Sequence, residues 1–144
     1  MTVPAAENKE DWLGEVIADL GSTVAKLDLL GRELDGAPSR AQMAEVWRCY
    51  LAVEKSVAFV RIELDEENPG RFVNTKAYVV PDERQALAFA ANSLRGGIEL
   101  LRAGSLRDGL KSLRESRNYL RMLLRREMLA RRRQTAAAAA KAPP

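Results

Sequence analysis

The stretch from Met43 to Leu64, MAEVWRCYLAVEKSVAFVRIEL, decides the fold class. Its apolar side chains recur at alternating steps of three and four residues. They are Met43, Val46, Tyr50, Val53, Val57, Val60 and Leu64. This spacing places them along one side of an α-helix, as in helices that pack lengthwise against other helices.

Short signals on either side of this stretch set the ends of the helix. Ser39 stands three residues before Gln42, and a Ser–Gln pair at this spacing caps helix N-termini. Asn68-Pro69-Gly70 ends the pattern, because Pro and Gly interrupt helices. The sequence therefore predicts a helix from about Arg40 to Asp65.

Three further segments show the same helical period. The first runs from about Lys9 to Leu34 and ends before Gly36-Ala37-Pro38, the second runs from Pro81 to Gly104, and the third begins after Ser105 and continues to about Arg133. Their apolar residues are Leu13, Ile17, Leu20, Val24, Leu27 and Leu34; Leu87, Ala91, Leu94, Ile98 and Leu101; and Leu106, Leu110, Leu113, Leu120 and Leu124.

Four helices of similar length, with two short connections, favour an all-α four-helix bundle made of two antiparallel hairpins. Residues 66–80 carry no helical period and are expected to form a long connector between the hairpins. We expect residues 1–133 to form a single helical domain. Residues 134–144 form a low-complexity, Ala-rich C-terminal tail, which is either a helical extension or a flexible segment.

Composition excludes several classes of enzyme and metal site. The 144 residues include one cysteine, Cys49, and no histidine. Ser-His-Asp and Cys-His nucleophiles, His-ligated metals and ordinary thiolate zinc sites are therefore excluded. We expect a protein that is not an enzyme and uses no metal or cofactor. No apolar run reaches the roughly 18 residues of a membrane span, and the start lacks a secretory pattern, so a soluble, cytoplasmic location is expected.

Charge is distributed unevenly along the chain. Residues 1–80 contain nine Lys or Arg against fourteen Asp or Glu, whereas residues 81–144 contain fourteen against six. The two parts therefore carry net charges of −5 and +8. Such an imbalance indicates an interaction with a charged partner.

The last predicted helix carries the clearest candidate binding residues. Arg107, Lys111, Arg114, Arg121 and Arg125 recur at three-, four- or seven-residue steps, which places them on one side, and Arg126, Arg131, Arg132 and Arg133 extend the charge. Such a row is suited to the phosphates of a nucleic acid and carries no code for bases. Two other interpretations stay open, a solvated helix face and a surface for an acidic protein.

The connector contains a second set of candidate contacts, Arg71, Phe72, Lys76 and Tyr78. Cations mixed with aromatic rings are suited to stacking on bases or to anchoring a partner. The alternative is that the rings cover one end of the bundle.

Other residues have structural interpretations. Arg117 interrupts the apolar row of the last helix, so it is expected to be paired or to lie at an edge, and with Arg95 and Arg102 it is a candidate for an ion network between helices with Glu99 or Glu115. Cys49 is expected to be a small buried apolar residue. Trp12 and Trp47 are expected to pack between the first two helices. Gly96-Gly97 marks a kink or a point of close helix packing.

These patterns support two functions. The first is a structural subunit of a larger assembly that contacts nucleic-acid backbone through the basic last helix, and the second is a protein–protein adaptor or homo-oligomer. In size, charge and expected architecture alone, the chain is similar to small helical subunits of RNA-guided interference complexes and to four-helix coat proteins of filamentous viruses. That similarity implies a nucleoprotein particle with other protein subunits and no membrane.

Overall fold

The chain folds into four α-helices that form a bundle, as shown by a computed structural model that describes residues 5–64 and 82–141. The helices are α1 (Ala5–Glu33), α2 (Arg40–Glu63), α3 (Glu83–Arg102) and α4 (Leu106–Lys141). No strand occurs in these residues. The predicted all-α four-helix bundle is therefore confirmed.

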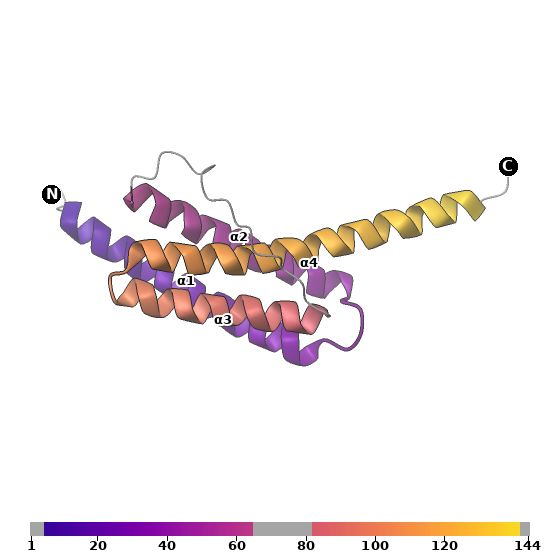
Figure 1. The fold of residues 1–144 in the computed structure, drawn as a ribbon, viewed down its shortest axis with the longest axis horizontal. Helices are drawn as coiled ribbons and strands as arrows, with labels where there is room; N and C mark the ends of the chain where they lie inside the picture. Colours follow the sequence, from indigo (N-terminus) through magenta and orange to yellow (C-terminus); the bar gives the residue numbers. More distant parts are fainter. Residues whose placement is uncertain (1–4, 65–81, 142–144) are drawn as a thin grey trace.

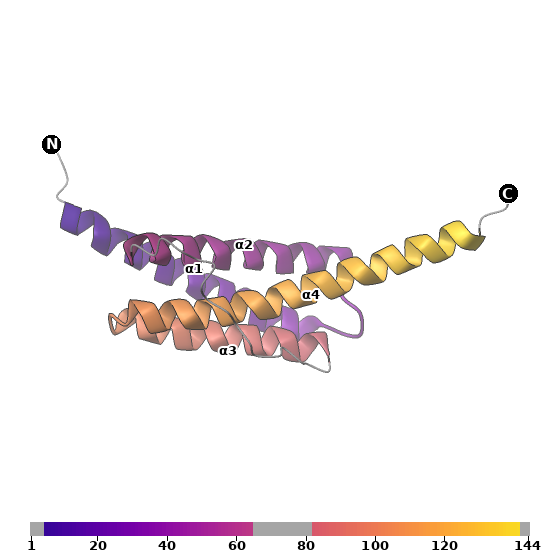
Figure 2. The same ribbon diagram turned by 45° about the horizontal axis from the view of Figure 1, so that its top comes forward.

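The helices are arranged so that each packs against two others. α1 and α4 each contact both α2 and α3. Figures 1 and 2 show that α1 and α2 are joined through a short loop and run antiparallel, and that α3 and α4 do the same. α2 and α3 run in the same direction, so the end of α2 and the start of α3 lie at opposite ends of the bundle.

The helix ends follow the predicted capping signals. The Ser39 hydroxyl accepts a hydrogen bond from the Gln42 N–H at 3.1 Å, and the Gln42 side chain accepts one from the Ser39 N–H at 2.9 Å. The Asp82 carboxylate caps α3 by accepting from the Gln85 N–H at 2.8 Å. Gly104, in the turn between α3 and α4, has φ +81°, a conformation that favours glycine.

The core is wider than a single row of apolar residues on each helix. All five predicted residues of α3 are buried. On α2, Cys49 is buried where Tyr50 was predicted, and Tyr50 is half-buried. The core also includes Val16, Leu30, Tyr119 and Leu123, which lie outside the predicted rows. The reason is that each helix meets two neighbours, so its buried side covers two adjoining rows. The predicted burial of Cys49 is confirmed.

α3 and α4 approach each other closely where two glycines face across the interface. A Cβ added at Gly97 would lie 3.0 Å from Leu113 Cδ2, and one added at Gly109 would lie 2.8 Å from Leu101 Cδ2. The predicted close packing at Gly97 is confirmed. Nearby, the Ser116 hydroxyl donates a 2.8 Å hydrogen bond to the Ala90 carbonyl, which links the same two helices.

α4 continues beyond the point where the sequence pattern ends. The periodic pattern predicts the helix to about Arg133 and leaves the Ala-rich segment either helical or flexible; α4 runs without a break to Lys141, so this segment is helical. Every described residue from Met128 onward is exposed. Figures 1 and 2 show this part of α4 projecting past the other three helices. We call residues 128–141 the C-terminal extension.

None of the four helices, over the residues described, is both long enough and apolar enough to cross a membrane.

Candidate nucleic-acid interface

The predicted binding residues lie almost entirely on the surface of α4. Eight of the nine are exposed, and we call them the basic surface of α4: Arg107, Lys111, Arg121, Arg125, Arg126, Arg131, Arg132 and Arg133. Arg107 and Arg125 are 18 residues apart, so the bundle part of this surface spans about 27 Å along the helix. The last three arginines stand on the C-terminal extension.

Arg114 differs from the other predicted residues because it is buried, with 6% of its surface exposed. Helical periodicity places it on the same side as Arg107 and Arg121, but periodicity takes no account of what lies over the helix. The middle of α4 is covered where it packs in the bundle, so the Arg114 guanidinium does not belong to the basic surface.

Most cations of the basic surface have no acidic partner among residues 5–64 and 82–141. Arg131 pairs with Glu127 at 3.1 Å, and Arg121 lies 3.5 Å from the Tyr50 hydroxyl and 4.0 Å from Glu54. Among the described residues, no carboxylate lies within ion-pair distance of Arg107, Lys111, Arg125, Arg132 or Arg133. These five cations are therefore available to an anionic partner.

Arg117 has a structural role, with a different partner from the one expected. Its Nε lies 3.2 Å from Glu54 Oε1 on α2, an ion pair whose atoms are not aligned as a hydrogen bond. Burial lowers the pKa of Arg117, and the Glu54 carboxylate opposes that effect. Arg95 pairs with Asp28 and Arg102 with Glu99, so they belong to separate ion pairs.

Replacing Glu54 by Leu is expected to destabilise the bundle by about 1–3 kcal/mol, because the largely buried guanidinium of Arg117 loses its carboxylate. The double variant E54L/R117M is expected to recover most of that loss, since apolar side chains can replace a buried ion pair at little cost. Urea unfolding followed by circular dichroism measures both. A double variant as unstable as E54L would contradict this explanation.

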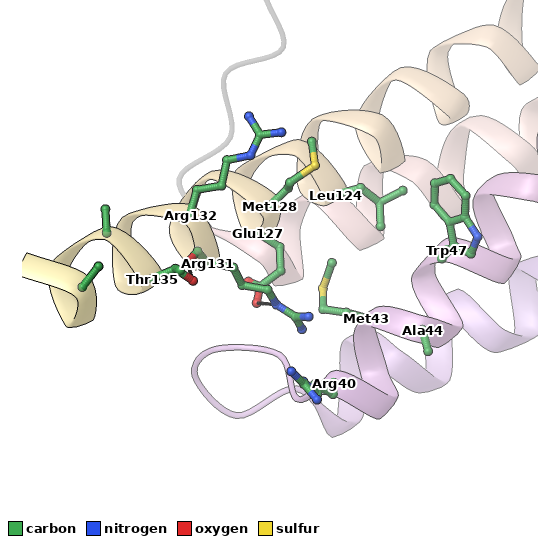
Figure 3. A pocket seen from close by; sticks show the side chains of 12 residues that line it. Arg40, Met43, Ala44, Trp47, Leu124, Glu127, Met128, Arg131, Arg132 and Thr135 are labelled. Carbon is green, nitrogen blue, oxygen red and sulfur yellow. Dashed lines mark hydrogen bonds and ion pairs between the residues drawn. The ribbon is translucent and has the colours of Figure 1, made fainter. Parts of the chain in front are cut away.

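A groove of about 890 Å³ lies between the start of α2 and the end of α4. We call it the α2–α4 groove. Its apolar lining includes Met43, Trp47, Leu124 and Met128, which we call the floor of the groove. The arginines of its lining, Arg40, Arg131 and Arg132, are called its rim. Figure 3 shows Met43 and Leu124 pointing into the space between the two helices, with Arg131 beside Glu127. A second apolar hollow of about 420 Å³ shares Trp47, Leu124 and Met128 and continues to Tyr50.

Trp47 does not pack between α1 and α2, as the sequence had suggested. It lines the α2–α4 groove, is 50% exposed, and stacks on Tyr50 with ring centroids 5.5 Å apart. Its position was missed because Trp47 lies just beside the predicted apolar row of α2, and the row does not show which neighbouring helix it faces. Trp12 packs against the core.

Cys49 is enclosed in the core and is not poised for chemistry. Burial raises the pKa of its thiol to about 11, and the Glu45 carboxylate adds to that effect. Only the thiolate reacts readily, so the folded protein holds this sulfur in its unreactive form at neutral pH.

In the folded protein at pH 8, Cys49 is expected to react with a thiol reagent at least about 100-fold more slowly than in urea. The reason is that the buried thiol becomes accessible only when the chain unfolds. The pKa of Cys49 in the folded protein, about 11, lies above its value in the unfolded chain. The neutral thiol therefore stabilises the folded state below pH ~8.5, and this contribution to the free energy of unfolding is lost as the pH rises toward 11. Stability measured against pH for the wild type and for Cys49→Ala isolates it. Rapid labelling of the folded protein would contradict the burial.

Arg71, Phe72, Lys76 and Tyr78, the predicted connector contacts, lie outside the described residues. Within residues 5–64 and 82–141, no three side chains of His, Cys, Asp or Glu gather in a way that could hold a metal ion.

Comparison with known proteins gives no family or relative. The chain matches no protein-family model, no curated protein and no solved structure.

Proposed function

We propose that this protein is a non-enzymatic structural subunit of a larger assembly and contacts nucleic-acid backbone through the basic surface of α4. The observation that carries the proposal is that five exposed cations of this helix have no described acidic partner. Such an assembly would be a nucleoprotein particle in the cytoplasm. The continuous helix keeps the cations in fixed register over its whole length.

The arrangement fits phosphates better than bases. Arg107, Lys111, Arg121 and Arg125 follow one side of α4 over about 27 Å, and the phosphates of one strand of a duplex are about 3.4 Å apart along its axis. Guanidinium groups can donate two hydrogen bonds to a phosphate. No Asn or Gln stands among these residues to read base edges, so sequence-independent binding is expected.

Fluorescence anisotropy with labelled oligonucleotides tests this function. Two unrelated duplexes and their single strands should bind with similar affinity, and log Kd should rise linearly with log salt between about 50 and 200 mM. The slope should be steeper for a duplex than for a single strand, because a duplex releases more counterions for each phosphate neutralised. Absence of binding at about 50 mM salt, where such contacts are strongest, would overturn the proposal.

The second candidate function is a protein–protein adaptor or homo-oligomer without a nucleic-acid role. The observation that favours it is the α2–α4 groove, whose floor is apolar and open to solvent. Sedimentation measurements of molecular mass, over a range of concentration and salt, test for self-association.

A further inference from the structure

The α2–α4 groove has the length and shape that a helix needs. On α4 its lining runs from Leu124 to Ala139, which is about 22 Å along the helix axis, and on α2 it runs from Arg40 to Trp47. α2 and α4 form the two sides of the groove, and Figure 3 shows Arg131 and Glu127 pointing into the space between them together with Met43 and Leu124. Grooves of this kind between helices accept the apolar face of a third helix.

The floor exposes large apolar side chains that the bundle leaves uncovered. Trp47 and Met128 are each 50% exposed, and both also line the adjoining hollow beside Tyr50. Contiguous exposed apolar surface indicates an interaction site, and flexible Met side chains adapt to a partner. The aromatic anchor and its apolar neighbours therefore provide the centre of an interface.

The C-terminal extension gives the groove one wall of small residues. Ala136 and Ala139 line its outer end, which lets the backbone of another helix approach closely. A projecting helix of this length has little stability of its own in water. A helix lying in the groove would bury one side of the extension against apolar side chains.

The rim of the groove selects the charge of the occupant. Arg40, Arg131 and Arg132 surround the outer part, and Arg121 and Arg125 line the adjoining hollow. The one acidic side chain on the described lining of the groove, Glu127, already pairs with Arg131. The rim is therefore positively charged, and an occupant with carboxylates along its edges would complement it.

The charge of the rim and the apolar lining argue against two other occupants. A second copy that placed its own extension in the groove would bring Arg131, Arg132 and Arg133 toward the same arginines, which is repulsive. A nucleobase stacked on Trp47 would have its polar edges against the thioethers and aliphatic carbons of Met43, Leu124 and Met128, which offer no strong hydrogen-bond partner.

We propose that the α2–α4 groove binds an acidic amphipathic helix of a partner protein, with its apolar face on Trp47 and Met128 and its carboxylates toward the rim arginines. Its central contacts are apolar, whereas its rim and the adjoining hollow share Arg121, Arg125, Arg131 and Arg132 with the basic surface of α4, so an acidic helix and a nucleic acid would compete for these four arginines. The partner helix presents apolar residues at steps of three and four, with Asp and Glu on both flanks.

A designed peptide and the native tryptophan test this proposal. The full chain carrying Trp12→Phe keeps Trp47 as its one tryptophan. The probe is an 18-residue amphipathic peptide with Leu and Met on one face and Glu elsewhere, without tryptophan, and its matched control has Lys in place of Glu. The Glu peptide is expected to shift Trp47 emission to shorter wavelength with a Kd of about 1–100 μM, and the Lys peptide to bind at least about tenfold more weakly.

Paired substitutions locate the binding. Met128→Glu places a charge in the groove floor and is expected to weaken the Glu peptide by about tenfold or more. Leu129→Glu makes the same change at the next residue, which is exposed and does not line the groove, and is expected to bind normally. Circular dichroism of both variants checks that the bundle is unchanged.

Four results would overturn the proposal. They are no binding of the Glu peptide, equal binding of the Lys peptide, a dimer in sedimentation that Met128→Glu dissociates, and an oligonucleotide that alone shifts Trp47 emission and loses this effect in Met128→Glu. The third would assign the groove to a second copy, and the fourth to nucleic acid.

Discussion

Replacing Val57 by Asp is expected to unfold the domain at room temperature or to lower its free energy of unfolding by about 4 kcal/mol or more. Val57 lies in the middle of α2 with 2% of its surface exposed, among the apolar side chains of the core. An aspartate there would lose its hydration without gaining a cation. Because small domains are stable by about 5–15 kcal/mol, one buried charge removes much of that margin.

Ala58→Asp is the matched control for this experiment. Ala58 is the next residue on the same helix and is exposed, so the new carboxylate stays in water. The expected loss is less than about 1 kcal/mol, mainly from helix propensity. Thermal and urea unfolding followed by circular dichroism compare the two variants. Equal melting temperatures for Val57→Asp and the wild type would mean that α2 does not bury this side.

The fold class could be predicted because apolar spacing reports helical packing directly. The row that begins at Met43 shows which side of α2 is buried, and Ser39 shows where the helix begins. The row does not show how many other helices pack against α2. α2 packs against both α1 and α4, so its buried side extends around to Cys49 and leaves Tyr50 half-buried beside α4.

The errors at the candidate site have the same origin. Spacing along one helix placed Arg114 with Arg107 and Arg121, but its burial depends on the packing of α4 in the bundle. Trp47 is similar, because the sequence identifies a residue beside an apolar row and does not identify the helix opposite. The partner of a charged residue is likewise determined by which helices pack together. Arg117 on α4 pairs with Glu54 on α2 because these two helices are in contact.

The α2–α4 groove could not be predicted from the sequence for a further reason. It exists because α4 continues past the bundle, and the Ala-rich segment contains no apolar row that predicts packing. Alanine favours a helix, yet a helix without a neighbour is marginal in water, so both a helical and a flexible segment were consistent with the composition. The extension forms one wall of the groove, and its helical state decides whether the groove is present.

Changing Arg107, Lys111, Arg121 and Arg125 to Gln is expected to lower affinity for a duplex by about three to four orders of magnitude at 0.1 M salt, because each lost phosphate contact contributes about 0.9 decade there. The slope of log affinity against log salt should flatten by about three to four units. The loss should be the same for unrelated sequences, since phosphate contacts carry no base code. Anisotropy titrations at several salt concentrations measure both quantities.

A second quadruple variant separates this effect from a change in net charge. Lys26, Arg48, Lys55 and Arg102 are exposed cations on the other three helices, and their change to Gln removes the same charge from a different part of the surface. If the basic surface of α4 is the contact, this control keeps most of the affinity and the slope, because only direct phosphate neighbours release counterions. If both variants lose affinity equally, attraction is set by net charge alone and α4 has no special place in it. A truncation after Ala130 then measures how much of the remaining affinity comes from Arg131, Arg132 and Arg133. Every described residue that it deletes is exposed, so the core stays whole.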